Sequence, residues 1–381
     1  MRMSRGASVG VVVWAAVWVV AASSGCSGRG AGQVGDGGIS SADGGPAFCV
    51  PPRQVCGGLC VDPGSDPNHC GTCDRTCATA APPVTAACRQ GHCVQTKRLL
   101  GLGTSQSLLT LDTTHLYYFD ADTPSESGLA RYRLLKAPKS TATPQPLATG
   151  LENAPDSLVG DDLDVYWTAA GILHRVPKSG GTATSSSLTG GSFHRLALDE
   201  THLYSAWLGA DPALLLRIPK PDGTIVFLLR PRLAPWSIAV DAESLYWTDG
   251  PAVNKMAKGG DTPSELASGF DSGRVLISSG EDLLLGVHGS GGALWRLPKA
   301  GGAALRLADA QGDPLDVAAD ASRVYWVGAG GLRRVSRGGG EAELLAPQSA
   351  LQVEVDPTGI YWIARGPEVG SAELLMSVVL W

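Results

Sequence analysis

The sequence has little charge and no concentrated patch of either sign. Asp, Glu, Lys and Arg make up only 17% of its 381 residues, and the formal net charge is −6. Nowhere does a basic run or stripe alternate with aromatic residues, which is the pattern typical of nucleic-acid-binding proteins. The sequence therefore predicts no nucleic-acid partner.

Beyond about residue 100 the chain also lacks the features of a helical protein. No long segment there repeats its apolar residues every 3.6 positions, and Gly and Pro recur too often for helices. What is present instead is a series of short apolar and β-branched runs bounded by Gly, Pro, Ser or Asp, a pattern typical of strands. This part of the chain is predicted to be all-β.

One short unit recurs through the β-rich part, and its clearest copy is Leu245-Tyr246-Trp247-Thr248-Asp249-Gly250. Neighbouring copies are spaced by about 40 residues, as expected of propeller blades. Their central residues are Tyr117, Tyr166, Tyr204, Tyr246, Leu284, Tyr325 and Tyr361. Seven copies predict a seven-bladed β-propeller, with six or eight blades as alternatives. The repeated aromatic residues are expected to form the core between blades.

The two ends of the repeat region are predicted to meet. The last copy provides three strands, at 351–356, 359–364 and about 373–380, and it lacks a fourth. The segment Gln95–Leu102 precedes the first copy and has no partner of its own. Pairing it with 373–380 would close the ring and remove an exposed sheet edge.

The repeat carries a recognisable motif. Tyr246-Trp247-Thr248-Asp249 matches the YWTD motif in full, and Tyr166-Trp167-Thr168 matches three of its four residues. On these residues the segment 94–381 resembles YWTD and NHL-type β-propellers. It looks closest to propeller-like repeats of secreted proteins from myxobacteria-like Gram-negative bacteria. YWTD propellers usually have six blades, so seven copies depart from that pattern.

The N-terminus is predicted to export and anchor the chain. Residues 1–25 combine a basic start with the uncharged run Val9–Ala22, which is typical of a signal peptide and too short for a comfortable membrane span. Ser23-Ser24-Gly25-Cys26 resembles a lipobox, although Ser23 replaces the usual Leu. The resemblance implies diacylation of Cys26, and Ser27 implies sorting to the outer membrane. Ordinary signal cleavage, leaving a spare thiol, is the alternative.

Two segments separate this anchor from the repeats. Residues 26–47 are rich in Gly and Ser and are predicted to form a flexible tether. Residues 48–93 are predicted to form four disulfides, because so short an exported segment cannot build an adequate core. Zinc binding by Cys70-x2-Cys73 with His69 and His92 is the weaker alternative. The eight cysteines are Cys49, Cys56, Cys60, Cys70, Cys73, Cys77, Cys88 and Cys93, an even number once Cys26 is set aside for a lipid.

No catalytic or metal-binding set is recognisable in the repeats. Nucleophilic catalysis requires Ser or Cys, a His base and an orienting carboxylate within reach, and the histidines there are scattered. Asp120-Ala121-Asp122 begins like a calcium loop, but Pro124 occupies the next ligand position. The sequence therefore predicts no catalytic residue, no metal and no cofactor.

Two recurring sets of residues are candidates for binding. Cations in the turns between the third and fourth strands are interpreted as solvated hairpin positions, with a cationic ring for an anionic glycan or lipid head group as the alternative; they are Lys178, Lys220, Lys258, Lys299 and Arg337. The loops that lead from one blade to the next are predicted to form the ligand face; they carry Asn153, His194, Trp236, Asp271 and Asp313. Trp236 follows Arg232 and is expected to present an aromatic platform near a cation.

These features favour a non-catalytic binding or scaffold lipoprotein of the cell envelope, with a protein or glycan partner. A hydrolase or lyase with a site at the central pore is the alternative, and a fold alone does not exclude it. Acidic or His side chains clustered at the pore mouth would favour that enzyme. A purely structural envelope protein is the third hypothesis.

Overall fold

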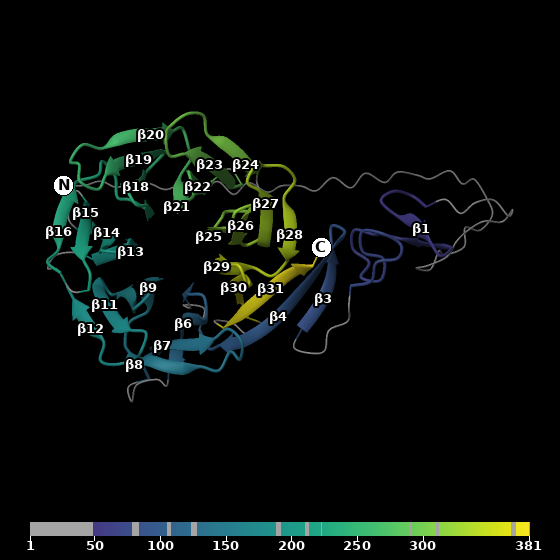
Figure 1. Cartoon of the computed structure of the whole chain (residues 1–381), viewed down its shortest axis with the longest axis horizontal. Helices are drawn as coiled ribbons and strands as arrows, with labels where there is room; N and C mark the ends of the chain where they lie inside the picture. Colours follow the sequence, from purple (N-terminus) through teal and green to yellow (C-terminus); the bar gives the residue numbers. More distant parts are fainter. Residues whose placement is uncertain are drawn as a thin grey trace, which may run out of the picture.

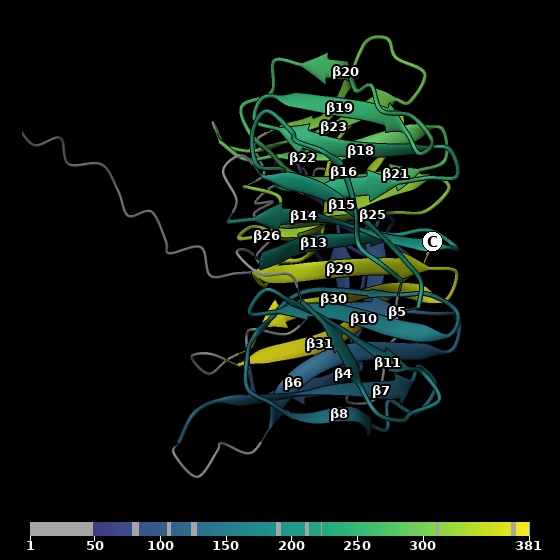
Figure 2. The ribbon, with the colours of Figure 1, turned by 90° about the vertical axis from the view of Figure 1, so that its left-hand side faces the viewer.

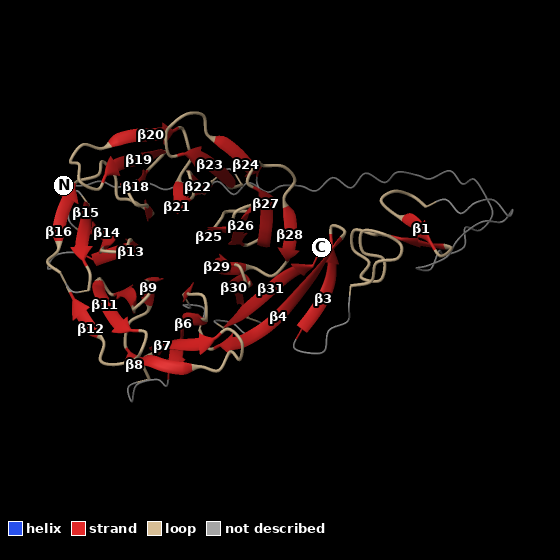
Figure 3. Ribbon diagram, in the orientation of Figure 1, coloured by secondary structure: helices blue, strands red, loops and turns tan. Residues whose placement is uncertain are grey.

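The computed structural model describes residues 49–77, 84–104, 108–122, 128–187, 192–209, 213–221, 223–289, 291–309, 312–366 and 371–380, with residues 373–380 described by their backbone only. The predicted signal peptide, tether and lipid-carrying Cys26 lie outside these ranges. All secondary-structure elements of the described residues are β-strands (Figure 3). Accordingly, the described residues contain no helix long and apolar enough to cross a membrane.

Antiparallel sheets are arranged in a ring around a common axis (Figure 1). Among the described residues, six of these sheets have four strands and one has five, which makes seven blades. The innermost strand of each blade contacts the innermost strands of both neighbours around the full circle. The all-β propeller predicted from the repeat is therefore confirmed, and the sheet count agrees with its seven copies.

The first six blades follow the chain from the channel outward. Blade 1 contains β5 (Leu109–Leu111), β6 (His115–Asp122), β7 (Arg131–Pro138) and β8 (Gln145–Leu151). Blade 2 contains β9 (Pro155–Gly160), β10 (Asp164–Ala169), β11 (Ile172–Pro177) and β12 (Thr184–Ser186). Blade 3 contains β13 (Ser192–Leu198), β14 (His202–Leu208), β15 (Leu214–Pro219) and β16 (Val226–Leu229).

Blade 4 contains β17 (Ile238–Val240), β18 (Ser244–Asp249), β19 (Ala252–Ala257) and β20 (Ser264–Ser268). Blade 5 contains β21 (Gly273–Ser279), β22 (Asp282–Val287), β23 (Ala293–Pro298) and β24 (Leu305–Asp309). Blade 6 contains β25 (Asp316–Ala319), β26 (Arg323–Gly328), β27 (Gly331–Ser336) and β28 (Glu343–Ala346). The side view shows the strands running across the thickness of the ring (Figure 2), so their connections lie alternately on its two faces.

Blade 7 joins the two ends of the chain. Its order from the channel outward is β29 (Ala350–Asp356), β30 (Gly359–Arg365), β31 (Ala372–Leu380), β4 (His92–Leu102) and β3 (Val84–Arg89). Ala372 lies opposite Leu102, and Leu380 lies opposite Cys93. The predicted pairing of Gln95–Leu102 with 373–380 is therefore confirmed. Because β4 starts at His92, the expected boundary between residues 93 and 94 falls inside one continuous strand.

The Cys-rich segment is tied to this closing strand. All eight of its cysteines form disulfides, as predicted: Cys49–Cys60, Cys56–Cys73, Cys70–Cys88 and Cys77–Cys93. The zinc alternative is wrong, because Cys70 and Cys73 belong to different disulfides and offer no thiolate. Two of the bonds attach the loop 70–77 to the β3–β4 hairpin. A short pair of strands, β1 (Gln54–Cys56) and β2 (Leu59–Val61), completes the segment.

The YWTD residues hold blade 4 together. Tyr246 and Trp247 are 1% and 2% exposed, which confirms the predicted aromatic core between blades. The Thr248 hydroxyl accepts the Ser237 N–H at 3.1 Å, and the Asp249 carboxylate accepts the Leu233 N–H at 2.8 Å. Every side chain of the motif therefore supports the second strand or the loop that enters the blade.

A repeated ion pair joins neighbouring blades. The turn after the first strand of most blades carries an Asp, and a Lys from the third-to-fourth-strand turn of the following blade reaches it. The Nζ–Oδ2 distances are 3.0 Å for Lys178–Asp112, 2.6 Å for Lys220–Asp161, 2.5 Å for Lys258–Asp199 and 2.9 Å for Lys299–Asp241. Lys139 of blade 1 pairs in the same way with Asp356 of blade 7. We call these five pairs, together with the contacts of Arg337 below, the inter-blade ladder.

Blade 5 varies the pattern because it has Ser279 where the other blades have Asp. There Arg337 of blade 6 replaces the Lys. Its guanidinium donates to the Ser279 carbonyl and lies 3.7 Å from the Asp282 carboxylate. The contact between these blades is therefore kept by a longer, more delocalised cation.

The ladder overturns both interpretations of the recurring cations. The five lysine side chains of the ladder are only 8% to 18% exposed, so they are not solvated hairpin positions. Each positive charge is also met by a carboxylate, so they do not form a free cationic ring. The Tyr204 hydroxyl donates to Asp199 at 3.0 Å, and equivalent bonds recur in other blades. Repeated Tyr, Asp and Lys therefore form one network.

The junction of blades 6 and 7 is different. Among the described residues no ladder pair spans it, because the third and fourth strands of blade 7 come from opposite ends of the chain. The β3–β4 turn reaches across instead, where the Gln90 side chain accepts the Leu344 N–H at 3.1 Å. Arg334, only 1% exposed, pairs with Glu343 at 2.6 Å inside blade 6. The disulfide-linked hairpin thus contributes to both blades.

Candidate functional site at the mouth of the central channel

The first strand of every blade faces the centre of the ring (Figure 1), and we call the space between these strands the central channel. Asp156, Arg195, Asp316 and Gln352 line a cavity of about 380 Å³ within it. These residues belong to blades 2, 3, 6 and 7. The ring therefore brings polar side chains that are far apart in the sequence to one place.

Polar side chains on the channel strands also connect the blades. At the same position of four first strands, a side chain accepts a backbone N–H from the next blade. The donor–acceptor distances are 3.0 Å for Leu196 to Ser157, 3.0 Å for Leu276 to Ser237, 3.0 Å for Val353 to Asp316 and 2.7 Å for Leu109 to Gln352. Blade 3 has Arg195 at this position, and that side chain is exposed in the channel cavity instead.

Two carboxyl groups on the innermost strands, Asp316 of β25 and Glu354 of β29, have raised pKa values. Burial, followed by the negative charge of Asp316, raises the pKa of Glu354 to about 8. Burial also raises the pKa of Asp316 to about 6. A carboxyl group held neutral near pH 7 is able to act as a general acid or to donate a hydrogen bond. The innermost strands therefore carry two neighbouring acidic groups of the kind that would favour the enzyme hypothesis.

At the rim of the channel, His194, Trp236 and Arg274 form a continuous stack from blades 3, 4 and 5. The His194 and Trp236 rings meet edge to face with centroids 6.4 Å apart, and the Arg274 guanidinium lies 4.9 Å from the Trp236 centroid. Burial, followed by the charge of Arg195, lowers the pKa of His194, so its ring is neutral at pH 7. Trp236 is nevertheless 47% exposed. We call these three residues the aromatic rim.

Positive charge gathers beside the aromatic rim. Arg195, Arg232 and Arg274 follow one another along blades 3 to 5, and in the described part of the chain no carboxylate forms an ion pair with their side chains. The acidic residues Asp156 and Asp316 come from blades 2 and 6, on either side of this run, and line one cavity together with Arg195. Positive and negative side chains therefore meet inside the ring.

The predicted ligand-face residues fall into three groups. His194 and Trp236 are brought together, although His194 lies inside β13 rather than in the loop before it. Asp313 pairs with His288 at 2.7 Å and accepts the Gly289 N–H at 3.1 Å, so it fixes the β22–β23 loop. Asp271 is exposed and lies against the same Gly289. Asn153 is exposed between β8 and β9, and the structure links it to none of the others.

Sequence reasoning missed five charged residues of the innermost strands: Asp156, Arg195, Arg274, Asp316 and Glu354. A signal was present, because each is a charged residue inside a strand that is otherwise mainly apolar. The predicted platform at Trp236 is present, but its cation is Arg274 from the next blade rather than the neighbouring Arg232. Asp120 and Asp122, which begin like a calcium loop in the sequence, lie elsewhere, and the Arg133 guanidinium lies 2.8 Å from the Asp120 carboxylate.

Comparison with solved structures supports the fold. One chain in the structure titled "Crystal Structure of Mitotic Checkpoint Complex" aligns with a TM-score of 0.59, 11% identity, 73% of this chain and 93% of its own. The β-propeller domain of Cps50 (Swd1) from Myceliophteria thermophila aligns with a TM-score of 0.56 and 13% identity, and the alignment covers 73% of this chain and 98% of that domain. The WD40 β-propeller domain of Doa1 aligns with a TM-score of 0.55 and 12% identity, and the alignment covers 74% of this chain and 96% of that domain.

At such low identity these likenesses establish architecture alone. No family model and no curated protein matches the sequence. The chain is therefore a β-propeller protein with an N-terminal disulfide-rich segment, as its strands and disulfides show directly.

Proposed function

We propose that this protein is an exported, envelope-anchored binding propeller that recognises a protein or glycan partner at the mouth of its channel. The observation that carries the proposal is the aromatic rim, in which Trp236 stays 47% exposed although His194 and Arg274 contact it. Trp and Arg are the residues most enriched among binding hot spots, and surface Trp also stacks on apolar faces of sugars. The resemblance to YWTD-type repeats is consistent with a binding role.

Replacing Trp236 with alanine should weaken binding of the partner by about 30-fold, the loss expected for a hot spot of about 2 kcal/mol. The partner would first be identified by screening the wild-type protein against glycans and envelope extracts, and its affinity then measured by calorimetry. Phe227→Ala is the matched control, because Phe227 is 59% exposed on the outer strand β16. Equal losses in the two variants would contradict recognition at the rim.

The anchoring part of the proposal rests on Cys26. The other eight cysteines are consumed in pairs by the four disulfides, which leaves Cys26 as the one without a partner in that set. Cys26→Ser should abolish incorporation of labelled palmitate and move the protein from the membrane to the soluble fraction, because the lipid provides the membrane affinity. Ser27→Ala is the control. Membrane retention of the serine variant would contradict lipid anchoring.

A second candidate function is catalysis in the channel. It is favoured by Asp316 and Glu354, whose raised pKa values would support proton transfer near neutral pH. A panel of hydrolase and lyase substrates separates the two functions. Turnover that is lost in Glu354→Gln, but kept in Trp236→Ala, would replace the binding function with an enzymatic one.

A further inference from the structure

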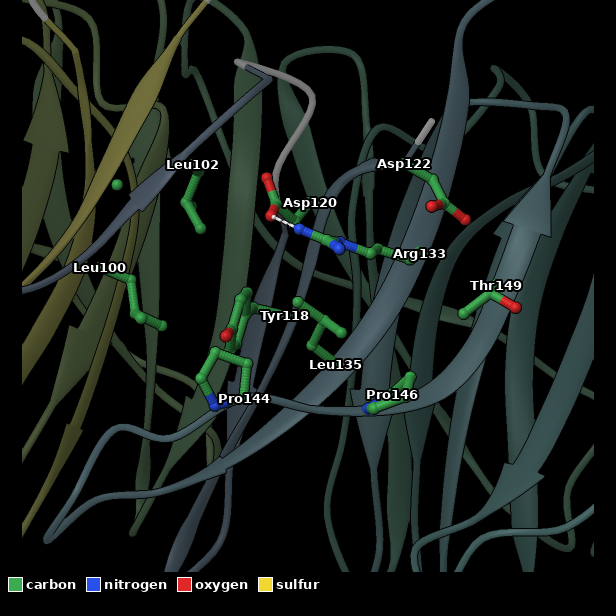
Figure 4. A pocket seen from close by; sticks show the side chains of 11 residues that line it. Leu100, Leu102, Tyr118, Asp120, Asp122, Arg133, Leu135, Pro144, Pro146 and Thr149 are labelled. Carbon is green, nitrogen blue, oxygen red and sulfur yellow. Dashed lines mark hydrogen bonds and ion pairs between the residues drawn. The ribbon is translucent and has the colours of Figure 1, made fainter. Parts of the chain in front are cut away.

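A second cavity lies away from the channel, at the seam where blade 1 meets the closing strand β4 (Figure 4). Its volume is about 420 Å³, within the range of about 300–1,000 Å³ that is usual for small-molecule sites. Leu100 and Leu102 come from β4, Leu135 comes from β7, and Pro144 borders them. We propose that this seam cavity binds a small neutral molecule that has an apolar body and a carbonyl oxygen.

The cavity arises from a change in the repeat. Tyr118 is the residue that follows the central Tyr of blade 1, and it packs between blade 1 and blade 7. Four other blades have the larger Trp at this position: Trp167, Trp247, Trp326 and Trp362. Each of them is no more than 2% exposed. Because protein interiors are close-packed, the smaller Tyr side chain leaves room that Trp fills in those four blades.

The hydroxyl of Tyr118 is a buried hydrogen-bond donor without an acceptor among the described residues. The residue is 1% exposed, and its hydroxyl has no hydrogen-bond partner among the described residues. Figure 4 shows this hydroxyl directed toward Pro144, away from the pair formed by Asp120 and Arg133. Burial, followed by the charge of Asp120, raises the pKa of Tyr118, so the phenol keeps its proton and can donate. A buried donor without an acceptor is unfavourable, and a ligand oxygen would satisfy it.

The polar end of the cavity argues against an anionic ligand. Asp120 accepts the Gly103 N–H at 2.7 Å, the Ala121 N–H at 2.8 Å and the Arg133 guanidinium at 2.8 Å. Its charge is thus already matched. Asp122 adds a further negative charge to the lining, so an anion would be repelled. Leucine and proline form most of the remaining wall, which favours an apolar body with a single acceptor.

The test compares two probes of similar size on the full chain. Acetanilide has a carbonyl oxygen, and propylbenzene lacks one. Wild-type protein should bind both in ligand-observed NMR titrations and should prefer acetanilide. Tyr118→Phe should weaken acetanilide about fivefold, the effect of one neutral hydrogen bond, and leave propylbenzene unchanged. It should not lower the melting temperature, because the hydroxyl has no partner to lose.

Tyr118→Trp provides the second variant, since it installs the residue of the other blades. It should fill the cavity, abolish binding of both probes and keep the fold, measured by circular dichroism. Unchanged acetanilide binding in this variant would overturn the proposal. So would wild-type protein that binds neither probe up to the solubility limit, or an equal effect of Tyr118→Phe on both probes.

Discussion

A chain that begins at residue 103 should be less stable than one that begins at residue 92 by about 5 kcal/mol. The shorter chain lacks β4 and with it Val94 and Leu102, which are 2% and 3% exposed. Burial of each side chain contributes about 1.5–3 kcal/mol. For a domain of this size the melting temperature should fall by about 10 °C or more. Differential scanning calorimetry of the two chains, with Cys93→Ala in the longer one, measures the difference.

Loss of β4 should also change how the protein associates. Without it, β31 becomes an unpaired edge, and such edges template pairing with other chains. Size-exclusion chromatography should therefore show self-association of the shorter chain only. The control removes β3 alone, by comparing chains that begin at residues 84 and 92 with both Cys88 and Cys93 replaced by alanine. Equal melting temperatures for the chains that begin at 92 and 103 would contradict the role of β4 as the closing strand.

Replacing Asp199 with alanine should lower the free energy of unfolding by about 3 kcal/mol. The carboxylate accepts the Thr201 and His202 N–H groups at 2.7 Å, the Tyr204 hydroxyl at 3.0 Å and the Lys258 ammonium at 2.5 Å. Its removal leaves the Lys258 charge, only 18% exposed, without a counter-ion. Removing one partner of a buried ion pair lowers stability by more than the intact pair contributes, because the remaining charge stays buried without a counter-ion.

Urea denaturation measures this effect, and Glu200→Ala is the matched control, because Glu200 is the exposed neighbour of Asp199. Lys258→Met should cost less than Asp199→Ala, since Asp199 keeps the donors supplied by Thr201, His202 and Tyr204. The double variant completes a cycle that isolates the pair. A loss in Asp199→Ala no larger than in Glu200→Ala would show that the inter-blade ladder adds nothing to stability.

The same variant should change the response to acid. Burial acts to raise the pKa of Asp199, but the bonds from Lys258 and from the backbone N–H groups outweigh it and hold the pKa well below its usual value. The same balance lowers the pKa of Asp241 to about 2. A lowered folded-state pKa stabilises the fold above the unfolded value of about 4, and this contribution is lost as the pH falls below it. Between about pH 4 and pH 2, Asp199→Ala should therefore lose less stability than the wild type.

The architecture could be predicted because its signal is repeated. Tyr246 and its counterparts recur once per blade on the second strand, which is buried on both sides, so the period of the sequence is the period of the fold. The pairing of Gln95–Leu102 with the C-terminal strand followed from counting strands. Even the degenerate copy at Leu284 lies on the second strand of its blade, because the spacing of the copies is kept where the Tyr is not.

The ladder was only half predictable. The sequence shows both the recurring Asp and the recurring Lys, but Lys258 and Asp199 are 59 residues apart, and nothing local says that the turns of successive blades meet. The channel was harder. Asp316 occupies a repeated position, but other blades have Ser157, Ser237 or Gln352 there, so no recurring charge marks it in the sequence. Glu354 is likewise not part of a recurring set of acidic residues. The roles of individual loop residues such as Asn153 and Asp271 remain predictions, since both are exposed and have no hydrogen-bond or ion-pair partner among the described residues.

The closing pair has a consequence for the order in which the protein can be completed. Synthesis runs from β4 to β31, so the strand made first receives its neighbour last, after all the other blades exist. During that interval β3 is the neighbour that β4 already has, held beside it by disulfides from Cys70 and Cys77. The cysteine-rich segment thus holds β4 extended and covers one of its edges, so that the other edge is ready to pair with β31.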